Sequence, residues 1–175
     1  MTGWRRWCAW LVWGALSVGL GVGCKEADAP RGEGSGEATP ASLWVAEVRA
    51  AHEAADDAAT PQERAAAHRA LERLALQDAP LGVAPTHARA VRQDLYFRIA
   101  SSAAGAGDAA AARDAATAGL ALGRADDVLT ANLLIARGEA YEALGDGTRA
   151  SADYLAAQRI HERLLDAVLG EEGAP

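Results

Sequence analysis

Residues 134–146 read Leu-Ile-Ala-Arg-Gly-Glu-Ala-Tyr-Glu-Ala-Leu-Gly-Asp, and Ala150, Tyr154 and Ala157 follow at helical spacing. Glycine and alanine are small enough to let two helix backbones approach closely, and tyrosine rings fill the space around such a contact. The Gly-Asp-Gly at 145–147 turns the chain between the two halves of the pattern. The stretch therefore predicts two antiparallel helices packed as a hairpin.

Apolar residues recur at helical spacing from Ser42 onward, and turn residues divide the pattern. The clearest boundary is at residues 60–63, where Thr60 can cap a helix, Pro61 suits its first turn and Glu63 completes a capping box. Asp108 and the pair Asp126-Asp127 mark further helix starts. Six helices are expected, the third covering about 86–104, and the others ending near Ala58, Gln77, Leu122, Leu144 and Gly170.

One stripe of each expected helix is predicted to face inward, and the fifth helix carries two stripes, which indicates burial on two sides. The predicted interior positions are Trp44, Val48, Ala51, Ala55, Ala58, Ala67, Leu71, Leu74, Val91, Leu95, Ile99, Ala103, Leu129, Leu133, Leu134, Ala136, Gly138, Ala140, Tyr141, Leu144, Ala150, Tyr154, Ala157, His161, Leu164 and Val168.

Composition supports an all-α fold and excludes one class of partner. Hydrophobic residues make up 50% of the chain and aromatic residues only 5%, with alanine supplying much of the former. Alanine is the strongest helix former, and strand-favouring residues are scarce after residue 40. The net charge of -7 and the lack of a basic stripe exclude a nucleic-acid partner.

The spacing of glycine, tyrosine and alanine over about 131–164 resembles a tetratricopeptide repeat. A weaker copy covers about 93–126, since Gly107-Asp108 and Ala112 recur 38 residues later as Gly145-Asp146 and Ala150. The first hairpin, 43–77, shows almost none of this signature. Antiparallel helical hairpins are therefore expected, arranged either as a tetratricopeptide-like solenoid or as a small helical bundle.

The resemblance implies that the first helix of each pair lines a concave groove. The residues it places there are Asp94, Phe97, Arg98 and Ser101 from one unit, and Asn132, Ile135, Glu139 and Glu142 from the next. Phe97 beside Ile135 would anchor a peptide or a helix of a partner protein. The alternative interpretation is that Phe97 packs against the first hairpin as part of the core.

The first 24 residues have the pattern of an export signal. Arg5 and Arg6 precede an uncharged apolar run, 7–23, which ends in Val-Gly-Cys at Cys24. This resembles the lipobox of bacterial lipoproteins, although Gly21 stands where that family usually has leucine. The resemblance implies cleavage before Cys24 and acyl chains on its side chain and new amino terminus. An uncleaved membrane anchor or an ordinary signal peptide is the alternative.

The resulting domain organisation has four parts. Residues 1–23 are the expected signal peptide, and 24–41 are the lipidated cysteine and a flexible linker rich in glycine, proline and charge. Residues 42–170 form the helical domain, and 171–175 are an expected disordered tail. In enteric lipoproteins, an aspartate after the cysteine favours the inner membrane. Lys25 stands there instead, which favours the outer membrane of a bacterial envelope, facing either the periplasm or the cell surface.

No pattern for catalysis, a cofactor or a metal stands out. The four histidines, His52, His68, His87 and His161, are not spaced as ligand pairs, and HExxH and CxxCH are absent. Neighbouring carboxylates such as Asp56-Asp57 point to different faces of a helix. We expect a non-catalytic adaptor that binds an unidentified envelope protein through a helical groove. A self-associating structural lipoprotein and a carrier of a small ligand are the alternatives.

Overall fold

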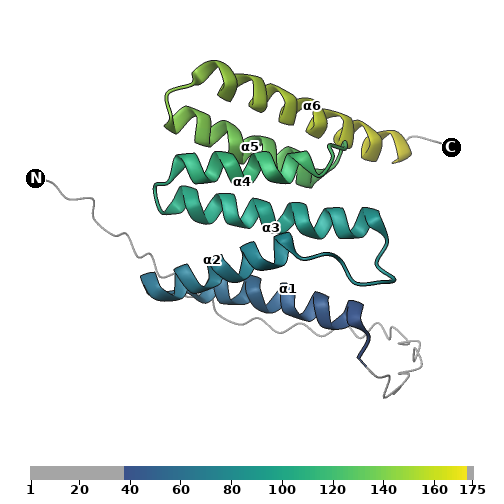
Figure 1. Ribbon diagram of the computed structural model, residues 1–175. Coiled ribbons are helices and arrows are strands. Elements are labelled where there is room, and N and C mark those ends of the chain that lie inside the picture. The colour runs from purple at the N-terminus through teal and green to yellow at the C-terminus, as the bar shows by residue number, and fades with distance from the viewer. Residues whose placement is uncertain (1–37, 173–175) are drawn as a thin grey trace, which may run out of the picture. The chain divides into compact units, whose positions relative to one another are not determined.

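The computed structural model describes residues 38–172, and the expected signal peptide, Cys24 and most of the expected linker lie outside this range. The described residues form six α-helices and no strand, so the chain is all-α as the composition predicts. The helices are α1 (Pro40–Asp57), α2 (Pro61–Leu76), α3 (Pro85–Gly105), α4 (Ala109–Ala121), α5 (Val128–Ala143) and α6 (Gly147–Glu172). Consecutive helices pack side by side as antiparallel hairpins (Figure 1).

Side chains cap the starts of the helices where the sequence indicates. The hydroxyl of Thr60 accepts a hydrogen bond from the Glu63 amide, and the Glu63 carboxylate accepts one from the Thr60 amide, which completes the capping box of α2. Asp108 accepts from the third amide of α4, and Asp127 does the same for α5. Asp127 is therefore the cap of the Asp126-Asp127 pair, and Asp126 is free for another contact.

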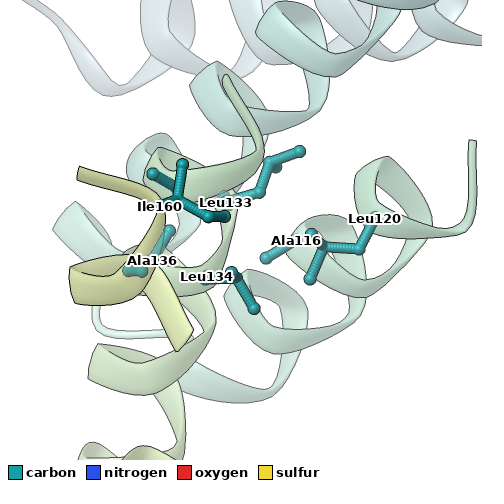
Figure 2. Packing of buried hydrophobic residues seen from close by; sticks show 9 residues of the cluster. Ala116, Leu120, Leu133, Leu134, Ala136 and Ile160 are labelled. Carbon is teal, nitrogen blue, oxygen red and sulfur yellow. The ribbon is translucent and has the colours of Figure 1, made fainter. Parts of the chain in front are cut away.

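Two main clusters of buried residues form the interior. The first joins α1, α2 and α3 through Trp44, Ala51, Leu71, Leu74, Ala75, Leu95 and Ile99. The second joins α3 to α6 through Ala100, Ala116, Leu120, Ala131, Leu133, Leu134, Ala136, Ala157 and Ile160. Figure 2 shows side chains of α4, α5 and α6 meeting in this second cluster. Alanine supplies most of the second cluster, and the first is built mainly from larger apolar side chains.

Two glycines allow the helices to approach one another closely. A Cβ atom at Gly138 of α5 would lie 2.6 Å from Cε1 of Tyr154 in α6, as the small-residue pattern of the opening stretch predicts. A Cβ atom at Gly119 of α4 would lie 2.8 Å from a methyl group of Leu133 and 2.9 Å from the Cβ of Tyr96. Alanine does not fit at either position without movement of a neighbour.

Buried Gln93 of α3 forms hydrogen bonds to the backbone at the C-terminal end of α4. Its Nε2 donates to the backbone oxygen of Gly123 at 2.8 Å and to that of Gly119 at 3.4 Å. The Gly119 oxygen also accepts from the Leu122 amide at 3.3 Å, whereas the Gly123 oxygen lies just beyond the last turn of α4. A side chain of α3 therefore supplies a hydrogen bond to the backbone that follows α4.

The sequence prediction was wrong at the outer positions of α6 and at the end of α5. His161 and Val168 of α6 are exposed, and Leu144 is 45% exposed beyond the end of α5. α6 continues to Glu172, two residues beyond its expected end. The apolar stripe is present in the sequence, but no described helix covers this face of α6. Periodicity shows which residues share a face, and it does not show whether that face has a neighbour.

Candidate functional site

An open apolar groove runs between α5 and α6 on the outer side of the last hairpin. It has a volume of about 540 Å³ and is lined by Ile135, Tyr154, Ala157, Gln158, His161, Glu162 and Leu165. Ile135 comes from α5 and the other residues from α6. The groove residues of α6 lie three, four, seven, eight and eleven positions after Tyr154, which places them along one face of the helix.

The difference in length between α5 and α6 exposes further apolar side chains beside the groove. α6 has 26 residues and α5 has 16, and Arg163 of α6 bonds Asp126, which precedes the start of α5. The residues after Arg163 therefore extend beyond α5, as Figure 1 shows. Leu165 is 57% exposed, Val168 60% and Leu169 56%. The groove thus continues into an unpaired apolar end of α6, which we call the α6 extension (residues 164–170).

The rim of the groove is acidic. Exposed Glu139 and Glu142 belong to α5, and exposed Glu162 belongs to α6. The hydroxyl of Tyr154 donates to Glu142 at 3.0 Å, and partial burial together with this carboxylate raises the pKa of Tyr154 to about 12. The Tyr154 hydroxyl therefore stays protonated at neutral pH and keeps its proton available for the hydrogen bond to Glu142.

The residues that the repeat resemblance places in a concave groove lie in two different environments. Asp94 and Arg98 face α1: the Asp94 carboxylate is 3.4 Å from His52 Nε2, and Arg98 donates to both oxygens of Asp56 at 2.7 and 2.8 Å. Phe97 is half-buried and packs against the cluster of α3 to α6. These three side chains serve contacts within the domain.

The predicted residues of α5 lie closer to the groove. Ile135 lines it and also packs against the core, and Glu142 bonds Tyr154 on its rim. Glu139 is exposed, and Asn132 is half-buried. Most of the groove comes from α6, which the resemblance did not include. The exposed apolar face of α6 was present in the sequence as a stripe, but it was assigned to the interior.

A partly buried ion pair also joins α5 to α6, and the sequence analysis missed it. Arg137 donates through Nε and Nη2 to the two oxygens of Asp153, both at 2.7 Å. The side chains of Arg137 and Asp153 are only 19% and 9% exposed. The bond to Asp153 raises the pKa of the Arg137 guanidinium. The pair fixes the register of the two helices that form the groove.

Two further properties of the described part of the chain bear on its chemistry. Among residues 38–172, no group of three or more His, Cys, Asp and Glu side chains is arranged to hold a metal ion. None of the helices in this part is both long and apolar enough to cross a membrane.

Comparisons of the chain with protein-family models, with curated proteins and with solved structures find no match.

Proposed function

We propose that this protein is a lipid-anchored adaptor of the bacterial envelope that binds an amphipathic helix of another envelope protein in the α5–α6 groove, without catalysis. The observation that carries the proposal is the open apolar groove and its continuation into the α6 extension. Exposed apolar surface of this kind is typical of sites for partner helices. A stripe of apolar side chains, spaced three and four residues apart on the incoming helix, would fill the groove beside Ile135 and Leu165.

The acidic rim defines the chemistry of the partner. Glu162 lines the groove, Glu142 accepts a hydrogen bond from Tyr154 of its lining, and the charge of Glu139 acts on the same tyrosine. A helix with lysine or arginine on both sides of its apolar stripe would match this rim, whereas an acidic helix would be repelled. We therefore expect a partner segment that is apolar along one face and basic at its edges.

The proposed anchor rests on the sequence before the described domain. Arg5 and Arg6, the apolar run 7–23 and Cys24 have the order of a lipoprotein signal. Several acyl chains on Cys24 would hold the chain firmly at a membrane, where one chain alone binds reversibly. The glycine- and proline-rich linker would then let the domain search for its partner near the bilayer.

We also propose that the α3–α4 and α5–α6 hairpins are degenerate tetratricopeptide-like repeats. The contact between Gly138 and Tyr154 supports this, because the two residues hold the glycine and aromatic positions of the repeat pattern. The shared spacing of Gly107-Asp108 and Gly145-Asp146 supports it as well. In such stacks the last helix normally presents a polar outer face. The apolar face of α6 agrees with a stack that a partner helix continues.

The docking proposal is tested by site-specific photocrosslinking in the native envelope. A benzoylphenylalanine at Gln158, inside the groove, is expected to crosslink to one segment with an apolar stripe and basic edges. Leu165→Asp should abolish this crosslink, because the carboxylate enters the apolar floor. Leu155→Asp is the matched control, since Leu155 is 53% exposed on the same helix and does not line the groove.

Two outcomes of this crosslinking experiment would contradict the adaptor. An equal yield of crosslink in the Leu165→Asp and Leu155→Asp variants would mean that the groove is not the docking site. A crosslink to a second copy of this chain would support the structural, self-associating alternative.

The anchor is tested separately by the intact mass of the membrane-bound protein. We expect a mass that corresponds to cleavage before Cys24 plus acyl chains, and we expect the Cys24→Ser variant to lose both changes. A mass that retains residues 1–23 would replace the lipid anchor with an uncleaved apolar segment.

A further inference from the structure

A second pocket lies on another face of α6, and its chemistry differs from that of the groove. It has a volume of about 340 Å³ and lies where α6 meets the start of α5. Ala156, Arg159, Ile160 and Arg163 line it from α6, and their spacing places them on one side of that helix. Tyr154, His161 and Leu165 of the groove occupy the opposite side. The two sites can therefore be occupied and altered independently.

Positive charge collects in this pocket although the chain as a whole carries a net charge of -7. Arg124, Arg159 and Arg163 all line it, and Asp126 is the only acidic residue that does so. Asp126 is already engaged, because both of its oxygens accept hydrogen bonds from Arg163 at 2.6 and 2.7 Å. Among the described residues, Arg124 and Arg159 have no carboxylate within ion-pair distance. Two guanidinium groups thus remain open to an anion.

The rest of the lining suits an anion that carries an apolar group. Leu134, Ala156 and Ile160 form an apolar floor. The Thr130 hydroxyl accepts a hydrogen bond from the Ala125 amide at 3.2 Å, so its own proton is free to be donated.

We propose that this pocket binds a small organic anion in which one carboxylate or phosphate group is carried on a short branched apolar stem. Arg124 and Arg159 hold the anionic oxygens, since guanidinium groups bind carboxylate and phosphate through paired hydrogen bonds. Leu134 and Ile160 contact the stem. The volume is at the lower end of the range of small-molecule pockets, which excludes a bulky ligand.

Asp126 acts as an internal competitor in this site. Its carboxylate accepts two hydrogen bonds from Arg163, as the carboxylate or phosphate of the ligand would from Arg124 and Arg159. Removal of the charge of Asp126 leaves Arg163 free as a third cationic partner and removes a repulsion against the incoming anion. The neutral variant Asp126→Asn is therefore expected to bind the anion more tightly than the wild-type protein.

The test is a titration of the full-length protein in detergent micelles with isovalerate, followed in 1H–15N spectra through the Ala125 and Thr130 amides. Saturable shifts are expected, and inorganic phosphate should bind more weakly because it has no stem. Arg159→Gln should weaken isovalerate binding by about two- to five-fold, and Asp126→Asn should strengthen it by a similar factor, the range found for one exposed charge at close range. Arg69→Gln removes a charge that does not line the pocket and should change nothing.

Several results would overturn the proposal. Isoamyl alcohol, the neutral analogue, must not produce the same shifts, since equal shifts would show that the anionic group is not recognised. Equal affinity in Arg159→Gln and Arg69→Gln would remove Arg159 from the site. Weaker binding in Asp126→Asn would contradict the competition by Asp126. Binding of inorganic phosphate as tightly as isovalerate would overturn the assignment of the apolar floor.

Discussion

Replacement of Gly119 by alanine should lower the free energy of unfolding by about 1–3 kcal/mol, although alanine is the better helix former. The added methyl group would lie 2.8 Å from a methyl of Leu133, which is fully buried, and 2.9 Å from the Cβ of Tyr96, which cannot rotate away from its backbone. α4 must therefore move away from α3 and α5, which loosens contacts throughout the second cluster. Urea unfolding followed by circular dichroism measures the loss.

Gly170→Ala is the matched control for Gly119→Ala. Gly170 also lies inside a helix, but a Cβ there meets nothing within 4 Å. Only the conformational effect of the substitution remains, and we expect a gain of up to about 1 kcal/mol. If both variants gained stability, the close approach of α4 to its neighbours would not limit the packing of this domain.

Asp153→Ala should destabilise the domain by about 2–3 kcal/mol, because it leaves the partly buried Arg137 guanidinium without its partner. The Arg137–Asp153 pair has two hydrogen bonds of 2.7 Å, and its side chains are 19% and 9% exposed. Thermal unfolding measures the change. In the double variant Arg137→Met with Asp153→Leu, apolar side chains replace both charges, so most of the stability should return.

The Arg163–Asp126 pair is the matched control for this second prediction. Its two hydrogen bonds of 2.7 and 2.6 Å have the same paired geometry, but its side chains are 51% and 59% exposed. Water solvates each charge when the partner is lost, so Asp126→Ala should change stability far less than Asp153→Ala. Equal losses from both substitutions would mean that burial does not determine the contribution of these pairs.

Local signals in the sequence predicted the helices well. The Thr60-to-Glu63 capping box, the Asp108 cap and the inward stripe of α2 are all confirmed. These features depend on residues within one or two turns of each other, so spacing alone is sufficient to recognise them. The all-α class follows from the alanine content in the same way.

Contacts between distant residues could not be predicted from the sequence. Arg137 and Asp153 are 16 positions apart, and nothing in either helix indicates that the other residue lies opposite. In the sequence, Gly119 is only a weak helix former within an alanine-rich stretch. Its role in the close approach of the helices is evident only from its contacts with Leu133 and Tyr96. The groove was missed for another reason: Tyr154, Ala157 and His161 of α6 have the spacing of a buried stripe, but no helix of the described residues covers the groove that they line.

The buried alanines also affect how much side-chain conformational entropy the chain loses when it folds. A buried leucine or isoleucine gives up roughly 0.5–1 kcal/mol of rotamer freedom, and a buried alanine gives up none. Ala100, Ala116 and Ala131 of the second cluster are 0% exposed, so part of the contact between α3, α4 and α5 forms without loss of side-chain freedom. This interior buries less apolar surface per residue than an all-leucine core, and in return it needs less selection among side-chain conformers.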